Sequence, residues 1–253
     1  MFEVACIVDK GQILSGNDDR GLVNGHVISE GEYQCRSDFV SAVVCDGVGG
    51  EQYGYEAAEM GVQHFASIFP VNLDETTVLN EIAGLNQTIL EGQRKDHAHA
   101  KMATTIAGIQ IREGSVMTFN VGDSKVYRYR PPFIAQLSTD HTLEKELNDL
   151  GLDSTNQPKH VITRFLGGDH AKPDFYSGNE NLLCDDSFLL CSDGISDVIE
   201  DAELEQIMGS NMSAMEQCRT LYNLAIKKGS EDNITVIIIK GVENDGYHTD
   251  AGE

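Results

Sequence analysis

Short apolar runs separated by turn-forming residues open the chain. Three of them, FEVACIV (2–8), GLVNGHVI (21–28) and DFVSAVVCDG (38–47), are divided by glycine, asparagine and aspartate. Apolar runs of this length between turn residues are typical of β-strands. The same pattern predicts strands between residues 102 and 137, in MATTIAGIQI, SVMTFNVG, KVYRYR and FIAQL, and a final strand in NITVIIIK (233–240).

Helical spacing of apolar residues marks several other segments. Ala58, Val62 and Phe65 fall on one face of a helix. Ser213, with Glu216 three residues later, forms the capping-box signature of a helix start. On this basis helices are expected at 52–69, 75–98, about 141–150, 194–209 and 212–229.

The order of these elements predicts the fold class. Strands come in runs, followed by helices in pairs and then by more strands, which differs from an alternating βαβ pattern. We therefore expect an α+β fold with mainly antiparallel sheets and helices packed on their outer faces. No repeat or linker divides the chain, so residues 1–240 are predicted to form one domain, followed by an acidic, disordered tail at 241–253. The polar segment GLDSTNQPKH (151–160) is expected to be an exposed loop or flap.

The composition narrows the possible partners. Acidic residues outnumber basic ones by 41 to 18, which gives a formal net charge of −23. Nucleic acids and anionic membranes are recognised by clustered Lys and Arg, so we expect neither as a partner. The six cysteines form no CxxC pair, which favours a reduced environment over a zinc or disulfide framework. Because the sequence shows no signal peptide and no apolar stretch long enough for a bilayer, the expected location is the cytoplasm.

Aspartates recur where apolar runs meet turns. They are Asp18, Asp19, Asp46, Asp123, Asp193, Asp197 and Asp232. Each one alone has a structural explanation, such as starting a turn or capping a helix. If several of these strand ends meet at one edge of a sandwich, their carboxylates repel one another unless cations neutralise them. All-oxygen ligands favour hard ions such as Mg²⁺ or Mn²⁺, and two such ions about 4 Å apart can hold a bridging water and a phosphoryl oxygen.

Other motifs in the sequence are weak. The G-x-G-G of residues 47–50 lacks the third glycine of a dinucleotide-binding loop, and no G-K-[ST] follows it. His97 and His99 lie in a polar segment that we expect to be an exposed loop, and His141 is expected at the start of a helix. No serine lies in a G-x-S-x-G turn and no cysteine in a C-x₅-R loop, so a covalent nucleophile is not indicated.

Eight segments, taken in order, resemble the motifs of the metal-dependent type-2C protein serine/threonine phosphatases. They are NDD (17–19), VVCDGVGG (43–50), MATTIAGI (102–109), FNVGDSKVY (119–127), LSTDHTLEKEL (137–147), VITRFLGG (161–168), LLCSDGISDVI (189–199) and EDNITVIII (231–239). The resemblance runs from about residue 1 to 240, and the compact form is most similar to the bacterial members. It implies a four-layer αββα sandwich, two central antiparallel sheets flanked by helices, with a binuclear Mn²⁺/Mg²⁺ centre at one end.

The resemblance also implies the catalytic positions. Asp46 would bridge the two metal ions, and the backbone carbonyl of Gly47 would ligate the second ion. Asp193 and Asp232 would hold the first. Catalysis in this family is a direct attack of the metal-bridging hydroxide on the phosphorus of a phosphoserine or phosphothreonine, which agrees with the missing covalent nucleophile.

Further acidic positions match the family in supporting roles. Asp18 and Asp19 would act through metal-bound water. Asp123 and Asp197 match positions that serve a third, weaker metal ion in some members. The resemblance thus implies two ions, and a third where those two carboxylates are used.

Two positions depart from the family pattern. Leu14 stands where the family usually carries an arginine that grips the substrate phosphate. Because bidentate contact between arginine and phosphate is strong, its loss should weaken substrate binding, or another cation must substitute, for which Arg20 and Arg164 are the candidates. Val48 stands where some members have a histidine that protonates the leaving group, and bacterial members commonly have an apolar residue there.

The sequence therefore predicts a metal-dependent phosphatase that acts on phosphorylated proteins and reverses the work of an opposing serine/threonine kinase. Leu14 keeps a second function open, a weakly active or non-catalytic module that binds phosphoproteins and retains the metal site for stability. A third function, hydrolysis of small phosphoesters, differs only in the substrate.

Overall fold

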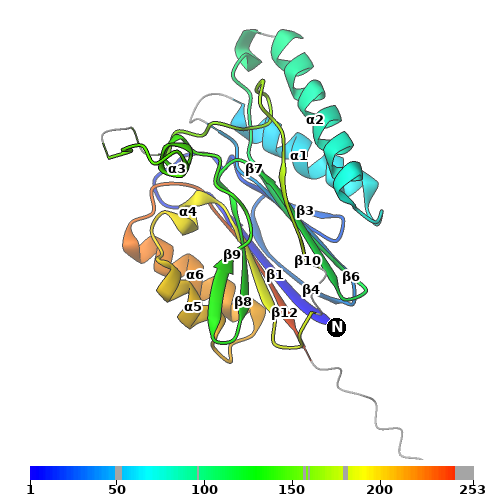
Figure 1. The fold of residues 1–253 in the computed structure, drawn as a ribbon, viewed down its shortest axis with the longest axis vertical. Helices are drawn as coiled ribbons and strands as arrows, with labels where there is room; N and C mark the ends of the chain where they lie inside the picture. The colour runs from blue at the N-terminus through cyan, green and yellow to red at the C-terminus, as the bar shows by residue number, and fades with distance from the viewer. Residues whose placement is uncertain (49–52, 96, 156–157, 159, 179–181, 243–253) are drawn as a thin grey trace, which may run out of the picture.

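Two antiparallel sheets of six strands form the centre of the computed structural model, which describes all residues except 49–52, 96, 156–157, 159, 179–181 and 243–253 (Figure 1). The first sheet has the order β4 (Gly31–Ser37), β1 (Phe2–Asp9), β12 (Ile234–Gly241), β11 (Ser187–Cys191), β8 (Lys125–Arg130) and β9 (Phe133–Gln136). The second has the order β10 (Asp174–Gly178), β7 (Ser115–Val121), β6 (Ile106–Arg112), β5 (Val40–Cys45), β2 (Arg20–Val23) and β3 (His26–Ile28).

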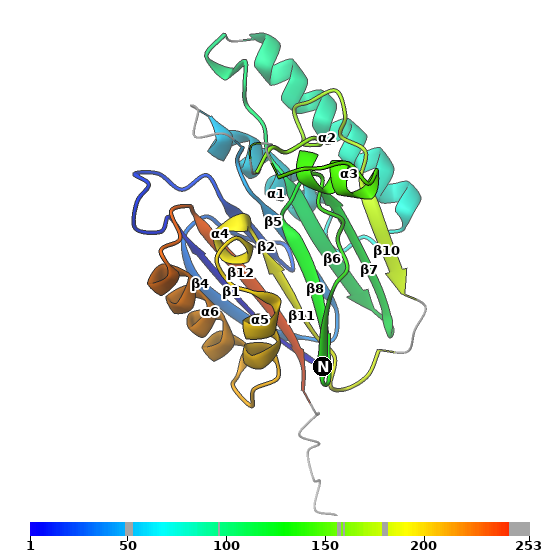
Figure 2. The ribbon, with the colours of Figure 1, turned by 60° about the vertical axis from the view of Figure 1, so that its left-hand side comes forward.

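Helices cover the outer face of each sheet. The second sheet carries α1 (Gly54–Ile68) and α2 (Glu75–Lys95), and the first carries α5 (Asp201–Met208) and α6 (Ala214–Lys228) (Figures 1 and 2). Three shorter helices lie near one end of the sandwich or beside α2: α3 (Leu143–Asp149), α4 (Asp193–Ser196) and the 3₁₀ turn η1 (His97–His99). The predicted α+β fold with helix layers outside two antiparallel sheets is confirmed. Among the described residues no helix has the length and apolar character needed to cross a bilayer.

Three apolar cores separate the four layers. Successive side chains of a strand point to opposite faces, so Val40, Ala42 and Val44 of β5 lie in the core between the sheets. Val43 and Cys45 of the same strand pack under α1 and α2 instead. Since both faces of the central strands are buried, these strands read as continuous apolar runs in the sequence.

Two strands were missing from the sequence-based expectation. Both β4 and β10 are edge strands, and half or more of their residues are partly or fully exposed. An edge strand in contact with solvent needs no apolar run, so the segment GEYQCRS of β4 gives a weak signal. The segment GLVNGHVI, by contrast, is a hairpin of two short strands that turns at Asn24 and Gly25.

Helix boundaries also differ from the expected ones. The helix predicted at 194–209 is divided into α4 and α5, because Glu200 and Glu203 form a capping box that starts a new helix. The helix predicted at 75–98 ends at Lys95, and η1 follows it. The end of the predicted tail, residues 243–253, lies outside the described residues, and Gly241 still belongs to β12.

Candidate metal centre

The register of the two sheets brings several strand ends to one edge of the sandwich. Arg20, the first residue of β2, pairs with Cys45, the last residue of β5. In the other sheet, Cys191 at the end of β11 pairs with Lys125 of β8 and Val236 of β12. The aspartates next to these positions are Asp19, Asp46, Asp123, Asp193 and Asp232. Strand pairing aligns these aspartates within each sheet, and the packing of the two sheets then gathers both groups at one edge, although up to 213 residues separate them in the sequence.

Mutual electrostatic effects show that these carboxylates share one site. Burial raises the pKa of Asp46 well above its usual range, and the negative charge of Asp193 raises it further. Burial likewise raises the pKa of Asp193, and Asp232 is the largest charged contributor there. Burial raises the pKa of Asp123 to about 6. The cluster is thus a region of strong negative potential that disfavours its own ionisation.

Asp19 is almost fully buried within this cluster. Its side chain is 1% exposed, and its Oδ2 accepts a hydrogen bond of 2.7 Å from the Ser192 hydroxyl. The same hydroxyl accepts a hydrogen bond from the backbone N–H of Thr235, at 3.0 Å. Burial raises the pKa of Asp19 to about 7, although hydrogen bonds from Ser192 and Thr235 lower it. Ser192, directly before Asp193, therefore ties the loop of Asp19 to β11 and β12.

Two buried oxygens in the cluster have no hydrogen-bond partner among the described residues. They are Oδ1 of Asp123 and Oδ1 of Asp193. Buried carboxylate oxygens are normally paired, and the neighbouring cation Lys125 is already engaged at 3.0 Å by Asp140. Hard divalent cations bind carboxylate oxygens and offset the repulsion between them. The residues present therefore fit a divalent metal ion.

The arrangement leaves most of the coordination to water and backbone groups. Within the described part of the chain, no three His, Cys, Asp or Glu side chains make up a metal-binding set by themselves. This agrees with ions such as Mg²⁺, which keep several waters and take one or two carboxylates each. Gly47 packs closely on the loop of Asp18 and the start of α1, since a Cβ at this position would overlap the backbone of Gly54 and the Cβ of Asp18. The rest of the G-x-G-G motif, residues 49–50, lies outside the described residues.

Asn233 fixes the loop that precedes β2 against the cluster. Its Oδ1 accepts a hydrogen bond of 2.7 Å from the backbone N–H of Asp18. Its Nδ2 donates to the carbonyls of Lys10 and Gly16, at 2.9 and 3.0 Å. Sequence reasoning missed this residue, because its only signal is its place between Asp232 and the last strand. The three bonds position the loop next to Asp232.

Replacement of Asn233 tests this positioning role. Asn233→Ala removes three hydrogen bonds at a residue that is 3% exposed, so we expect about 2–3 kcal/mol lower unfolding free energy in urea. We also expect Mn²⁺ to bind at least about tenfold more weakly in calorimetry. Asn211→Ala, at an exposed position, is the matched control. Unchanged Mn²⁺ affinity in Asn233→Ala would show that the loop holds its place without these bonds.

Arg20 is bound to Glu59 and to carbonyls of its own loop. Its Nε donates to Oε2 of Glu59 on α1 at 2.7 Å, and its Nη1 donates to the carbonyls of Asn17 and Asp19. The residue is 9% exposed. Through these bonds the guanidinium of Arg20 connects the loop of Asn17 and Asp19 to α1. Arg20 as a phosphate ligand therefore stays a prediction that requires it to leave Glu59.

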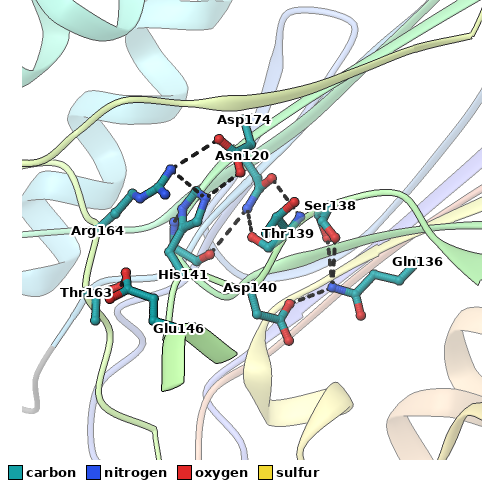
Figure 3. Close-up of polar contacts among 11 residues, drawn as sticks. Asn120, Gln136, Ser138, Thr139, Asp140, His141, Glu146, Thr163, Arg164 and Asp174 are labelled. Carbon is teal, nitrogen blue, oxygen red and sulfur yellow. Dashed lines mark hydrogen bonds and ion pairs between the residues drawn. The ribbon is translucent and has the colours of Figure 1, made fainter. Parts of the chain in front are cut away.

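Arg164 lies in a polar network at the base of the predicted flap (Figure 3). Its Nη1 donates to Asp174 at 3.1 Å and lies 3.3 Å from Nε2 of His141. His141 is buried two residues before α3, and its Nδ1 accepts the N–H of Gly122 at 3.0 Å. Burial and the charge of Arg164 lower the pKa of His141, which is therefore neutral and donates from Nε2 to Asp174. His141 thus links Arg164, after the predicted flap, to the loop before Asp123. The sequence predicts only that His141 lies at the start of a helix.

An acidic cleft of about 120 Å³ opens beside the cluster. Its lining residues are Asp123, Lys125, Asp140, Thr142, Glu144, His160, Asp193 and Asp197. His160 reaches across from the flap, and its Nδ1 lies 2.8 Å from Oδ2 of Asp197. Asp18 and Asp197 also belong to the site, and burial raises the pKa of each.

His99 of η1 contacts residues of α1 and the turn before it. His99 is partly buried and pairs with Glu56 of α1 at 3.3 Å, so it does not belong to an exposed loop as the sequence suggested. Its ring also packs edge-on against Tyr53, with the centroids 4.1 Å apart. These contacts give His99 a structural role between α1 and η1.

Comparisons with known proteins were made for sequence and for structure. The sequence model of the family described as Protein phosphatase 2C matches residues 31–227. The chain is 30% identical over 248 residues to the serine/threonine phosphatase Stp of Listeria innocua, covering 92% of this chain and 93% of that protein. It is 29% identical over 257 residues to the protein phosphatase PhpP of Streptococcus pneumoniae, covering 96% and 99%.

Solved structures share the arrangement of sheets and helices. The serine/threonine phosphatase Stp1 from Staphylococcus aureus superposes with a TM-score of 0.83 at 26% identity, covering 96% of each chain. The catalytic domain of the serine/threonine phosphatase PstP, solved in complex with two manganese ions, has a TM-score of 0.78 at 23% identity, covering 96% of this chain and 100% of that one. The likeness to PstP is a likeness of fold.

Proposed function

The chain belongs to the Protein phosphatase 2C family, and we propose that it is a serine/threonine protein phosphatase whose clustered carboxylates hold the metal ions of the reaction. The observation that carries this proposal is the set of aspartates gathered at one edge, with two buried oxygens that have no hydrogen-bond partner in the described chain. The named relatives are phosphatases of proteins. This favours the catalytic function over the non-catalytic module suggested by Leu14.

We assign the following roles in metal binding to these residues. Asp46 would contact both ions, with the carbonyl of Gly47 on the second, and Asp193 and Asp232 would hold the first. Manganese or magnesium bound there would supply the Lewis acidity that activates water and clamps the phosphoryl oxygens. Ser192 would keep its neighbour Asp193 in place through the shared bond network at the strand ends.

Supporting carboxylates lie around this set. Asp18 and Asp19 would act through water, and Asp123 and Asp197 would serve a third ion at the acidic cleft. Without metal ions, burial raises the pKa of Asp19 to about 7, and cations bound nearby would favour its ionised form. We further propose that the substrates are phosphoproteins made by a serine/threonine kinase.

The two cysteines next to the aspartate cluster do not act as nucleophiles. Cys45 and Cys191 end the strands that lead into Asp46 and Asp193, and both are 0% exposed. Burial raises the pKa of Cys191 to about 12 and that of Cys45 still further. A thiol must ionise to act as a nucleophile, so these side chains serve as apolar packing.

Phosphate release from a phosphothreonine peptide tests the proposed function. We expect turnover with Mn²⁺ or Mg²⁺, loss of turnover in excess EDTA, and recovery when Mn²⁺ is restored. A phosphotyrosine peptide and p-nitrophenyl phosphate serve as comparison substrates. Full turnover in EDTA would contradict the metal centre, and a much higher kcat/KM for the small ester than for the phosphothreonine peptide would indicate a small-phosphoester hydrolase.

A further inference from the structure

Exposed apolar side chains gather around the mouth of the metal centre. Eleven large apolar side chains are exposed among the described residues. Two of them lie on the loop that packs on Asp232, and three lie on the segments bonded to α3, whose N-terminal side lines the acidic cleft. We call these five the apolar rim: Ile13, Leu14, Leu150, Leu152 and Val161. Single exposed apolar residues are common on proteins, but a group that borders a functional site marks an interaction surface.

One side of the apolar rim is a short loop with both ends anchored. Gly11 has a φ of +71° and packs so closely on the Asp232 carbonyl that a Cβ would overlap it. Five residues later, the Gly16 carbonyl is held by Asn233. Residues 12–16 between these anchors are all exposed, with Ile13 67% and Leu14 39% accessible. The loop therefore presents two aliphatic side chains next to Asp232.

The other side of the apolar rim is formed by the residues at the two ends of the predicted flap, Leu150 and Leu152 after α3 and Val161 after His160. The Val161 carbonyl accepts the N–H of Leu143 at 2.8 Å, and the Thr163 hydroxyl donates to Glu146 at 2.7 Å (Figure 3). Val161 directly follows His160, which pairs with Asp197 in the cleft. Figure 2 shows the loop after β1 and the helix α3 on opposite sides of α4. A substrate peptide bound over the metal centre would therefore pass between the two parts of the apolar rim.

The charges at the mouth favour apolar over acidic neighbours of the phosphate. Leu14 replaces a cation at the loop, and Arg20 is engaged by Glu59. In the cleft, Lys125 and the ring of His160 are paired with carboxylates as well. Acidic residues beside the phosphoamino acid would meet further carboxylates, such as Glu144 in the cleft lining, and the one lysine of that lining is already paired with Asp140. Aliphatic residues would instead bury surface against the apolar rim.

We propose that the apolar rim selects substrates in which aliphatic side chains, and not acidic ones, flank the phosphorylated residue. The inference rests on the proposed function, since only a phosphoryl group bound at the aspartate cluster places its neighbours between the loop and the flap. An extended peptide advances about 3.3 Å per residue. The selected positions are therefore the residues that directly flank the phosphoamino acid in the sequence.

A double-mutant cycle between enzyme and peptide tests the proposal. Two phosphothreonine peptides are compared, one with leucine and one with serine at the flanking positions, together with p-nitrophenyl phosphate as a substrate without flanks. The wild-type enzyme is expected to prefer the leucine peptide about tenfold in kcat/KM, mainly through KM. Leu14→Ser is expected to reduce this preference to about threefold, and Ile13→Ser to a similar value. Leu79→Ser is the matched control, because Leu79 lies on α2 and is 38% exposed.

The possible outcomes distinguish a failure of the proposed apolar rim from a failure of the proposed phosphatase function. Equal kcat/KM for both peptides in the wild type, or a preference for an acidic peptide, would overturn the role of the apolar rim. So would a Leu14→Ser enzyme that loses the same factor on both peptides, because the coupling would then be zero. Failure of the wild type to release phosphate from p-nitrophenyl phosphate and from all peptides with Mn²⁺ would instead refute the proposed function.

Discussion

Asp46→Asn is expected to lower kcat for a phosphothreonine peptide at least about a thousandfold at saturating Mn²⁺. The variant keeps the size of the side chain but removes the negative charge that would contact both metal ions. A thousandfold loss corresponds to about 4 kcal/mol of transition-state stabilisation, which is in the range of a metal ion's contribution to charge stabilisation. Calorimetry with Mn²⁺ should show weaker uptake in the same variant.

The fold of the Asp46→Asn protein should remain intact. Burial and Asp193 already disfavour a charge at position 46, so a neutral amide relieves repulsion in the metal-free protein. Its unfolding free energy in EDTA should be equal to or higher than that of the wild type. Asp38→Asn is the control, since the Asp38 side chain is 79% exposed and pairs with the N-terminal amine. Wild-type turnover in Asp46→Asn would remove this aspartate from the mechanism, and an unfolded variant would contradict the repulsion argument.

The sequence predicted the parts of the fold that depend on local periodicity. The central strands β1, β5, β11 and β12 are buried on both faces, so each appears as an apolar run. Asp46 and Asp193 follow strands of different sheets, and the packing of the two sheets brings them to the same edge, as the recurrence of aspartates after apolar runs suggested. The polar edge strands β4 and β10 could not be recognised, because their pairing partners and not their own side chains hold them in the sheets.

The surroundings of the aspartates could not be predicted from the sequence. Arg20 is directed to Glu59, which lies 39 positions away on a different element. Asn233 acts through backbone groups of a loop more than 200 positions earlier. His160 contacts Asp197, which lies 37 positions later at the end of α4. Such partners depend on tertiary packing, whereas the aspartates themselves were identified by their place at strand ends.

Without metal, the protein should lose stability as the pH rises from about 4 to about 7. Burial raises the pKa of Asp19 from 3.8 to about 7 and that of Asp123 to about 6. Between these values and 3.8, the folded state binds more protons than the unfolded state, so the free energy of unfolding falls with increasing pH. For Asp19 alone the shift corresponds to about 4 kcal/mol. His141 acts in the opposite direction, because burial lowers its pKa and the folded state holds fewer protons at this position.

Mn²⁺ should reverse most of this loss at pH 7, because it replaces the protons as the counter-charge of the carboxylates. At a free Mn²⁺ concentration of about 100 times Kd, binding to the folded state alone adds about 2.7 kcal/mol per ion. At pH 5 the gain should be smaller, since protons and Mn²⁺ compete for the same oxygens. Urea unfolding at pH 5 and 7, with EDTA or Mn²⁺, measures both effects. Asp19→Asn isolates one group, because its unfolding free energy in EDTA should decrease less between pH 5 and 7 than that of the wild type. If the wild type in EDTA were instead equally stable or more stable at pH 7, the buried carboxylates would not repel one another as strongly as their surroundings indicate.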